Sequence, residues 1–418
     1  MEEKMIITHD GPKVIFEVGV VDHTCLRCGN KDKSLFYEYA STFDNKKICY
    51  CMSCIIMGRS DSSNPIRGIS SEREKMMLNY HLDFDLNDIQ ENASDKIVDA
   101  INHKHHLLLY AVTGAGKTEI TFKGIQYARQ KGLNVAFVSP RIDVVKEVYL
   151  RLRDAFKDAQ IDILYSRVKN VYSHMFTVCT VHQLMNYIEH YDFIIIDEVD
   201  AFPLPDEPLL MSVILRAASK NASIILMTAT PTRDMIELVG KENIVTISRR
   251  YHGHDLTIPK IIYQDIEKYI KKKRAPHKLI SLLDDITARD RKVLVFVAEI
   301  KMLEPLKSIL QKRYSRLESV YSGDPERMEK VQLMRDNQVD ILLTTTILER
   351  GVTFLNLDVI VLSAERFDFA QLIQICGRVG RKIGDPIGNI WFLSSEKTYG
   401  IKETIRRIKA FNKGQAKL

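Results

Sequence analysis

Apolar residues in the first half of the chain gather into short, nearly continuous runs, at residues 107–111, 134–138, 176–179, 193–196 and 223–227. Between these runs, apolar positions recur every three or four residues, as at Val145, Val148 and Leu152, which is the spacing of a helix with one buried face. Strands that are apolar on both faces and alternate with helices are typical of a parallel sheet covered on both sides. The pattern therefore predicts an α/β fold.

The alternation weakens over residues 248–290 and then resumes, with apolar runs at residues 292–297, 341–343, 359–362 and 390–393. We expect a second parallel sheet there, and the weak stretch marks a boundary between two lobes. The predicted domains are residues 1–75, a small N-terminal module with its linker, residues 76–250, the first lobe, and residues 251–418, the second lobe. Within the module, residues 5–7 and 14–18 are predicted to form two short strands around a turn at residues 10–12.

Five of the seven cysteines lie close together in the N-terminal module. Four of them form two Cys-x-x-Cys pairs, Cys25 with Cys28 and Cys51 with Cys54. This spacing indicates a structural zinc site of four thiolates, tetrahedral and with no open position. Cys49 is an alternative to Cys51 as a ligand, although only Cys51 has the two-residue spacing to Cys54. Two unrelated pairs of buried thiols are the interpretation that needs no metal.

The apolar run at residues 107–111 leads into a turn that contains Thr113, Gly114, Ala115, Gly116, Lys117 and Thr118. A strand, a glycine-containing turn, Gly-Lys-Thr and a helix together indicate a phosphate-binding P-loop, and the helix is expected over residues 119–129. Backbone N–H groups and the helix start can hold a polyphosphate, Lys117 can reach the β- and γ-phosphates, and Thr118 can bind magnesium. Ala111 stands where the strict pattern has glycine. A chance Gly-Lys-Thr in an ordinary turn is the alternative.

Two more polar motifs have a chemistry that suits nucleotide hydrolysis. Asp197 and Glu198 directly follow the run at residues 193–196; Asp197 can hold magnesium, and Glu198 can deprotonate the attacking water. Arg378 and Arg381 lie in the segment Gln374–Arg381, which we expect to begin a helix. Their planar guanidinium groups suit phosphate oxygens. A basic surface turn would explain the two arginines alone, but not their presence beside a P-loop and an Asp-Glu pair.

Composition and charge change this picture little. The net charge of +6 does not by itself imply nucleic acid. No apolar run approaches the length of a membrane span, and the N-terminus lacks the features of a signal peptide, so we expect a cytoplasmic protein. Basic residues cluster at residues 268–274 and 402–417, and in the second cluster Ile401, Ile405 and Ile408 have helical spacing. This predicts a C-terminal helix with one packed face and one basic face.

In order and spacing, the motifs resemble those of superfamily 2 helicases. The segments similar to motifs I, II, III, V and VI are Ala111–Thr118, Asp197–Asp200, Thr228–Pro231, Thr344–Thr353 and Gln374–Arg381. The cysteine pairs ahead of the first lobe, with Asp197–Pro203 and Thr346–Thr353, further resemble the ComFA family of late-competence DNA-uptake ATPases, over nearly the whole chain. The resemblance implies two RecA-like lobes with ATP, magnesium and zinc as cofactors. It also implies ATP hydrolysis that single-stranded DNA stimulates.

The resemblance implies further sites and partners. It places Gln90 at the adenine of ATP, and Gly351 and Thr353 elsewhere at the nucleotide. The residues that it places at the sugar–phosphate backbone of DNA are Pro140, Arg141, Thr180, His182, Tyr321, Ser322, Gly323, Thr344 and Thr345. Backbone contacts carry no sequence information, which suits a translocase. The implied protein partners are ComFC and DprA, and the family works beside a membrane DNA channel, which allows a peripheral position at the inner face of the membrane and a homo-oligomer.

Two other functions stay open at this point. A duplex-unwinding repair or replication-restart helicase would share the motif set, as PriA does, but in PriA the zinc module lies inside the second lobe, and no segment here is long enough for a strand-separating wedge. A zinc-dependent DNA-binding scaffold with a dead ATPase would not need the intact Lys117, Asp197, Glu198, Arg378 and Arg381. ATP turnover without DNA, with single strands and with duplex, measured beside strand displacement, separates the three functions.

Overall fold

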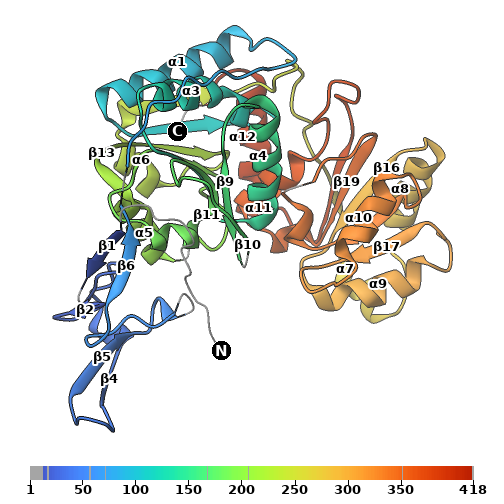
Figure 1. The fold of residues 1–418 in the computed structure, drawn as a ribbon. Helices are drawn as coiled ribbons and strands as arrows, with labels where there is room; N and C mark the ends of the chain where they lie inside the picture. Colours follow the sequence, from blue (N-terminus) through green and yellow to red (C-terminus); the bar gives the residue numbers. More distant parts are fainter. Residues whose placement is uncertain are drawn as a thin grey trace. The chain divides into compact units, whose positions relative to one another are not determined.

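A computed structural model of the chain describes residues 13–16, 18–55, 58–70, 72–166, 168–205, 207–350 and 352–416 (Figure 1). The chain divides into two compact units. The first comprises Met1–Tyr110 and Lys117–Val245, and the second comprises Ala111–Gly116 and Thr246–Leu418. The strand predicted at residues 5–7 and the turn predicted at residues 10–12 lie outside the described residues. In the part of the chain that is described, no helix combines the length and the apolarity that a bilayer span requires.

The first unit is built on an eight-stranded sheet with the order β10-β9-β11-β8-β12-β13-β7-β14. Its strands are β7 Leu107–Ala111, β8 Val135–Ser139, β9 Asp162–Tyr165, β10 Val168–Asn170, β11 Phe176–Thr180, β12 Tyr191–Asp197, β13 Ala218–Thr228 and β14 Ile244–Ile247. The pairs from β9 through β7 are parallel, and β10 is antiparallel to β9. The predicted parallel sheet is thus confirmed, and its central strands are buried on both faces.

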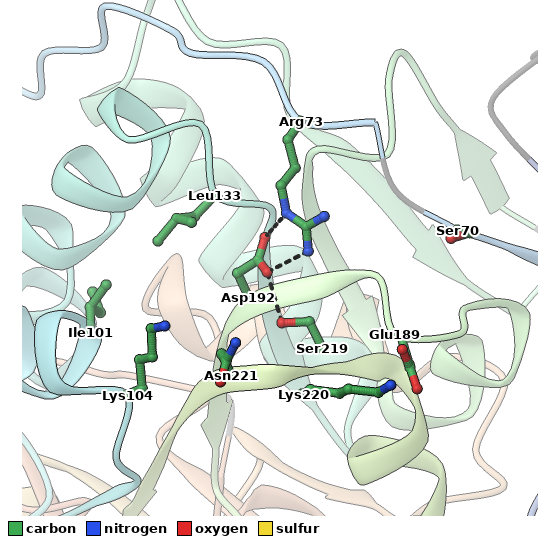
Figure 2. A pocket seen from close by; sticks show the side chains of 10 residues that line it. All are labelled: Ser70, Arg73, Ile101, Lys104, Leu133, Glu189, Asp192, Ser219, Lys220 and Asn221. Atoms are coloured by element: carbon green, nitrogen blue, oxygen red, sulfur yellow. Dashed lines mark hydrogen bonds and ion pairs between the residues drawn. The ribbon is translucent and has the colours of Figure 1, made fainter.

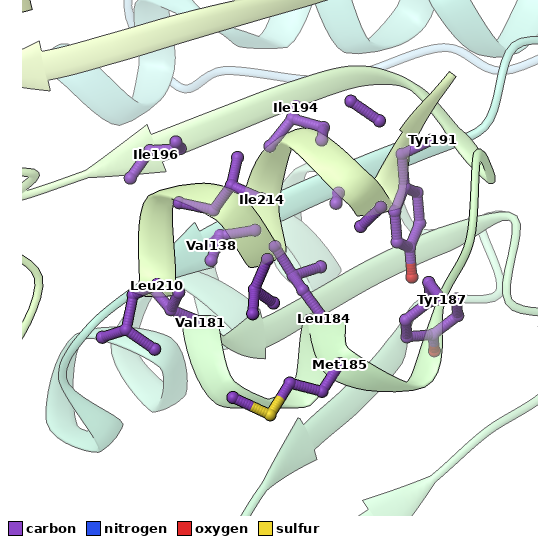
Figure 3. Packing of buried hydrophobic residues seen from close by; sticks show 14 of the residues in the cluster. Val138, Val181, Leu184, Met185, Tyr187, Tyr191, Ile194, Ile196, Leu210 and Ile214 are labelled. Atoms are coloured by element: carbon purple, nitrogen blue, oxygen red, sulfur yellow. The ribbon is translucent and has the colours of Figure 1, made fainter. Parts of the chain in front are cut away.

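Helices cover both faces of this sheet. They are α1 Asp88–His103, α2 Lys117–Ile120, α3 Phe122–Gln130, α4 Ile142–Ala155, α5 Pro208–Ala217 and α6 Arg233–Val239, with the 3-10 helix η3 at Val181–Asn186. Successive strand residues point to opposite faces. Phe193 of β12 therefore meets α3, at 3.4 Å from a Cβ built on Gly124, whereas Ile194 and Ile196 pack with α5 and η3 in the core of Figure 3.

The N-terminal module consists of three small antiparallel pairs. Its strands are β1 Lys13–Phe16 with β6 Ile66–Ile69, β2 Val20–Val21 with β3 Thr24–Cys25, and β4 Phe36–Ala40 with β5 Lys47–Cys51, and η1 spans Lys33–Leu35. Strand β6 therefore lies within residues 58–75, which were predicted to form the linker. The module belongs to the first unit and packs on the rest of it, because Arg216 of α5 donates to the Arg27 carbonyl and Ile69 forms a bridge with Tyr187.

The second unit has a six-stranded sheet with the order β15-β20-β19-β16-β18-β17, and each neighbouring pair is parallel. Its strands are β15 Lys260–Tyr263, β16 Lys292–Phe296, β17 Leu317–Val320, β18 Ile341–Thr344, β19 Leu357–Leu362 and β20 Ile390–Ser394. Its helices are α7 Ile266–Lys271, α8 His277–Ala288, α9 Leu303–Leu310, α10 Arg327–Arg335, α11 Phe369–Cys376 and α12 Tyr399–Asn412. On α12, Ile401 and Ile408 are buried while Lys402, Arg406 and Lys409 are exposed, as the helical spacing predicted.

Candidate nucleotide, metal and nucleic-acid sites

The P-loop joins the end of β7 to the start of α2. Gly114 and Gly116 have φ angles of 79° and 76°, a left-handed backbone that glycine adopts without steric cost. Lys117 and the buried Thr118 open α2, so the N–H groups of a helix start face the turn. The helix expected over residues 119–129 is interrupted at Thr121, which leaves the α2 ladder and donates its hydroxyl to the Thr118 carbonyl at 2.6 Å. The short α2 turn therefore carries both P-loop side chains.

Asp197 and Glu198 stand at the carboxyl end of the central strand β12. Asp197 is 8% exposed, and burial raises its pKa to about 6, with Lys117 opposing this shift and Glu198 adding to it. Glu198 has a φ of 54°, an uncommon conformation for a residue with a side chain, which costs on the order of 1 kcal/mol. A divalent cation beside these carboxylates would favour their ionised forms. The pair therefore suits magnesium and water activation.

The motif II and motif III segments touch each other in the first unit. The hydroxyl of Thr230 donates to Asp200 Oδ2 at 2.6 Å, and the Thr230 N–H donates to Thr228 Oγ1 at 2.8 Å. Thr228 ends β13, which is the parallel neighbour of β12, so both segments leave the sheet at the same edge. A side-chain hydrogen bond from Thr230 to Asp200 therefore joins the two segments beyond the ends of β12 and β13.

Gln90, the predicted adenine contact, lies in the first turn of α1. Its Oε1 accepts from the Asn87 N–H at 3.0 Å, and its own N–H donates to Asn87 Oδ1 at 3.0 Å. These two bonds form a capping box, which stabilises the start of the helix. Gln90 is 2% exposed. The structure thus gives Gln90 a clear role in folding α1, and its contact with adenine stays a prediction.

In the second unit, the paired arginines follow a helix where we expected them to begin one. Helix α11 ends at Cys376, so Gln374 is in its last turn, Gly377–Gly380 form the turn after it, and Arg381 follows that turn. The prediction was wrong because Leu372, Ile373 and Ile375 extend the apolar helical pattern upstream, from a capping box at Asp368. Arg378 donates to the Val352 carbonyl, and Arg381 Nη1 lies 3.3 Å from Thr353 Oγ1. Gly351 lies outside the described residues.

The four predicted zinc ligands meet in the N-terminal module. The Sγ atoms of Cys25, Cys28, Cys51 and Cys54 are buried and lie within 4.8 Å of one another. The Cys25–Cys54 and Cys28–Cys51 Sγ distances are both 3.7 Å. Bonds of about 2.3 Å in a tetrahedron about zinc require an S···S edge of about 3.8 Å, so the four thiolates fit this metal.

Neighbouring donors also suit a site with negative charge on sulfur. Arg27 Nη2 donates to Cys54 Sγ at 3.0 Å, and Asn30 Nδ2 lies 3.8 Å from Cys51 Sγ. Cys49 does not join this cluster. It lies instead with His23 and Glu38, and Glu38 is already paired with His23 and Lys47. The structure therefore selects Cys51 as the fourth member of the buried cluster.

The predicted DNA-contact residues follow the carboxyl ends of neighbouring strands in each unit. In the first unit, Ser139 of β8 pairs with Thr180 of β11, so Pro140–Arg141 and Val181–His182 leave the sheet side by side. In the second unit, Val320 of β17 pairs with Thr344 of β18, which sets Tyr321–Gly323 beside Thr345. Ser322 and Gly323 are exposed, while the Thr344 side chain is fully buried and donates to the Thr345 carbonyl. Thr344 is thus placed to shape this loop.

The opposite, amino-terminal edge of the first sheet holds a hollow of about 490 Å³ (Figure 2). Arg73 crosses it and donates to Asp192 through Nε at 2.9 Å and through Nη2 at 2.7 Å. Ser219 Oγ and the Asn134 N–H also donate to Asp192, at 2.7 and 3.1 Å. Sequence reasoning missed this ion pair, because the two residues are far apart in the chain and belong to no motif.

Together, the two parallel sheets, the P-loop, the Asp-Glu pair and the arginine turn define a helicase-type ATPase of superfamily 2. Family models agree: residues 83–233 match the res subunit of type III restriction enzymes, and residues 274–383 match the helicase conserved C-terminal domain. The Saccharomyces cerevisiae protein Dbp5, solved bound to RNA and ADP BeF3, has the same fold, with a TM-score of 0.57 and 16% identity over 79% of this chain and 88% of that chain.

Residues 2–67 match the N-terminal domain of competence protein ComFA. Competence protein ComFA of Bacillus subtilis is 36% identical over 95% of this chain and 87% of that protein. Its namesake in Streptococcus pneumoniae is 35% identical over 93% of this chain and 90% of that protein. The chain belongs to the ComFA family and is a competence-associated, helicase-like enzyme that hydrolyses ATP.

Proposed function

We propose that this enzyme is an ATP-driven translocase on single-stranded DNA in the DNA-uptake machinery. The observation that carries the proposal is the repeated placement of loops with polar side chains and backbone groups at the carboxyl edges of both sheets, beside Ser139–Thr180 and Val320–Thr344. Such loops suit phosphate contacts, which are independent of base sequence. A translocase that moves along one DNA strand needs such phosphate contacts in both of its units.

In this proposal, the P-loop and the end of β12 hold and hydrolyse the nucleotide. Backbone N–H groups of residues 113–118 and Lys117 bind the phosphates, while Thr118 and Asp197 hold magnesium, which supplies charge neutralisation at the phosphates. Glu198 orients and deprotonates the attacking water. Arg378 and Arg381 place positive charge on the transferred phosphoryl group. Gln90 and Thr353 contribute further nucleotide contacts.

Zinc in the four-thiolate cluster has a structural role in the proposal, because all four sulfur ligands are buried and no ligand position is open. The Arg216–Arg27 contact would hold the module against the eight-stranded sheet domain of the first unit. For protein partners, we propose ComFC and DprA on the basis of the family resemblance. Pull-down of each purified partner on the immobilised enzyme tests this, and retention at the level of an unrelated protein would contradict it.

The central experiment measures ATP turnover without DNA, with single strands and with blunt duplex, beside a strand-displacement assay. We expect single strands to stimulate turnover, and duplex to stimulate it little and not to be unwound. If one strand of the duplex is displaced while ATP is hydrolysed, the protein is an unwinding helicase instead. The resemblance of the cysteine module to the ComFA N-terminal domain argues against that alternative.

The proposed DNA contacts can be tested with one variant and a matched control. Arg141, at the carboxyl end of β8, is one of the predicted phosphate contacts, and its side chain is 16% exposed. Arg153, on the α4 helix that follows, is 58% exposed and lies away from the strand end. We expect Arg141→Ala to weaken single-strand binding and to reduce the slope of affinity against salt by about 1, with no change for Arg153→Ala. Equal effects of the two variants would overturn the proposed DNA contacts.

A further inference from the structure

Arg250 is the largest fully buried side chain in the described part of the chain, and no motif contains it. It follows β14 and begins the second unit's connection toward β15, and it is 1% exposed. Its Nη1 donates to the Val379 carbonyl at 2.6 Å and also to the Gly380 carbonyl. These carbonyls lie between Arg378 and Arg381. Arg250 therefore holds the turn that carries the two predicted catalytic arginines.

The rest of the Arg250 guanidinium group has no partner. Its Nε and Nη2 atoms are buried and make no hydrogen bond, and it forms no ion pair within the described residues. A guanidinium has five N–H donors and stays charged in proteins, and a buried cation without a counter-charge is costly. Burial and the nearby Arg381 lower the pKa of Arg250 to about 10, which still leaves it protonated at neutral pH. The unpaired Nε–Nη2 edge has the geometry that accepts a carboxylate or phosphate in two parallel hydrogen bonds.

The P-loop turn lies against this side chain within the same compact unit. The Cγ and Cδ atoms of Arg250 are each 3.7 Å, and its Nε 3.8 Å, from where a Cβ on Gly114 would be. The next residue, Tyr251, donates its N–H to the Gly114 carbonyl at 3.1 Å. Gly114 lies in the loop whose N–H groups wrap the phosphates in the proposed function. The unpartnered edge of Arg250 is therefore close to a site for several negative charges.

We propose that Arg250 is a third arginine of the nucleotide site, which fixes the Gly377–Arg381 turn through Nη1 and offers its Nε–Nη2 edge to a phosphate oxygen of the bound nucleotide. The inference rests on the proposed assignment of the P-loop to ATP. The close packing of this turn on Arg250 and on the P-loop also accounts for two glycines. A Cβ on Gly380 would lie 2.8 Å from Arg250 Nη1, and a Cβ on Gly377 would lie 2.0 Å from Thr113 Oγ1. Only residues without a side chain allow these approaches.

The test compares Arg250→Ala with Arg249→Ala, because Arg249 is the adjacent residue and is exposed. An arginine that contacts the transferred phosphoryl group can contribute about 10³- to 10⁵-fold to turnover. We expect Arg250→Ala to lower kcat by at least about 10²-fold and to weaken ATP binding, whereas Arg249→Ala keeps both. Nucleotide affinity is measured with ATP and with ADP. Weaker binding of both nucleotides would place Arg250 at the β-phosphate, and weaker binding of ATP alone would place it at the γ-phosphate.

Two further measurements separate phosphate contact from support of the fold. Millimolar guanidinium, well below denaturing concentrations, should restore turnover to Arg250→Ala at least about tenfold, because it can occupy the vacated guanidinium site; it should not stimulate Lys117→Ala. Should Arg250→Ala not fold, Arg250→Lys decides the question. It keeps the charge and the stem but loses the planar fork, so we expect a folded protein with a reduced kcat.

The outcomes distinguish a failure of the Arg250 inference from a failure of the assignment of the P-loop to ATP. Normal turnover and normal ATP affinity in folded Arg250→Ala or Arg250→Lys would overturn the inference while leaving the P-loop assignment intact. A reduced kcat in Arg250→Ala with no rescue by guanidinium and with unchanged affinity for both nucleotides would also overturn it, because the residue would then act only on the fold. Normal turnover in Lys117→Ala would instead show that the P-loop assignment itself is wrong.

Discussion

The two ends of strand β12 carry buried aspartates in opposite electrostatic states. At the amino end, Asp192 accepts hydrogen bonds from Arg73, Ser219 and the Asn134 N–H. Burial alone would raise its pKa, but these donors outweigh burial, and the pKa falls below its usual value. At the carboxyl end, Asp197 is as buried as Asp192, and its pKa rises to about 6. One strand thus holds a stabilised carboxylate at one end and a destabilised one at the other.

The difference shows what each edge of the sheet does. A carboxylate whose oxygens are occupied by protein donors has no capacity for a ligand, and it contributes to folding instead. A buried carboxylate beside a second acid and a lysine lacks such compensation, and it becomes favourable when a cation binds. The amino edge of β12 is accordingly an anchor for the segment that leads from the four-cysteine module, and the carboxyl edge is the candidate site of chemistry. The predictions below test this division.

The largest expected effect is at the four-cysteine module, which precedes the Arg73 anchor in the chain. Cys54→Ser should release zinc and lose metal-coupled folding energy on the order of 10 kcal/mol. We expect hydrogen exchange to rise over residues 18–55 and 58–70 and to change little over residues 107–118. Metal analysis and exchange mass spectrometry on the full chain check this, with Cys49→Ser as the control that keeps zinc. Purified protein without zinc would contradict the site itself.

The second prediction concerns ATP turnover and changes only the carboxyl edge of the sheet. Glu198→Gln removes the proposed base and keeps the shape of the side chain, so turnover should fall by about 10²- to 10⁴-fold while ATP stays bound. Glu189 is a matched control, because it precedes β12 as Glu198 follows it and also has a left-handed backbone, with φ angles of 44° and 54°. Glu189→Gln should turn over ATP normally. Normal turnover in Glu198→Gln would remove Glu198 from the chemistry.

The third prediction, with a smaller effect, concerns the unfolding free energy and changes only the amino edge of the sheet. Asp192→Asn places an amide among donors that need acceptors, so the unfolding free energy should fall by about 1–3 kcal/mol. ATP turnover per folded molecule should stay the same. Chemical denaturation beside a turnover assay checks both, with the exposed Asp154→Asn as the control. A loss of turnover without a loss of stability would show that the two ends of β12 are not divided in this way.

Much of this division could be predicted from the sequence, for physical reasons. Continuous apolar runs predicted the parallel sheets, and polar residues at the ends of those runs located Asp197, Glu198 and the P-loop, because ligand sites in such sheets lie at the carboxyl edge. The cysteine spacing identified the buried four-thiolate cluster. These signals are local in the chain.

The features that the sequence did not predict depend on distant residues or on competing local signals. The Arg73–Asp192 pair joins two segments whose contact only the folded sheet creates. Arg250 is one basic residue among several, and only its burial distinguishes it. The segment Gln374–Arg381 was predicted to begin a helix, whereas the apolar positions Leu372, Ile373 and Ile375 belong to α11, which ends at Cys376. In each case tertiary packing decided the outcome.

The smallest predicted effect is a dependence of stability on pH that belongs to Asp192. Its pKa is lower in the folded protein than in the unfolded chain, where an aspartate titrates near about 3.9. The folded state therefore binds fewer protons, and the stabilisation by Asp192 is complete above about pH 4 and disappears as the pH falls through its folded-state value. The difference in unfolding free energy between the wild-type protein and Asp192→Asn should consequently be constant from about pH 5 to 7 and shrink below about pH 4. Denaturant titrations of both proteins across this range measure it. A difference that stays constant down to pH 3 would show that the Asp192 carboxylate is not held ionised by Arg73, and the contrast between the two ends of β12 would then rest on Asp197 alone.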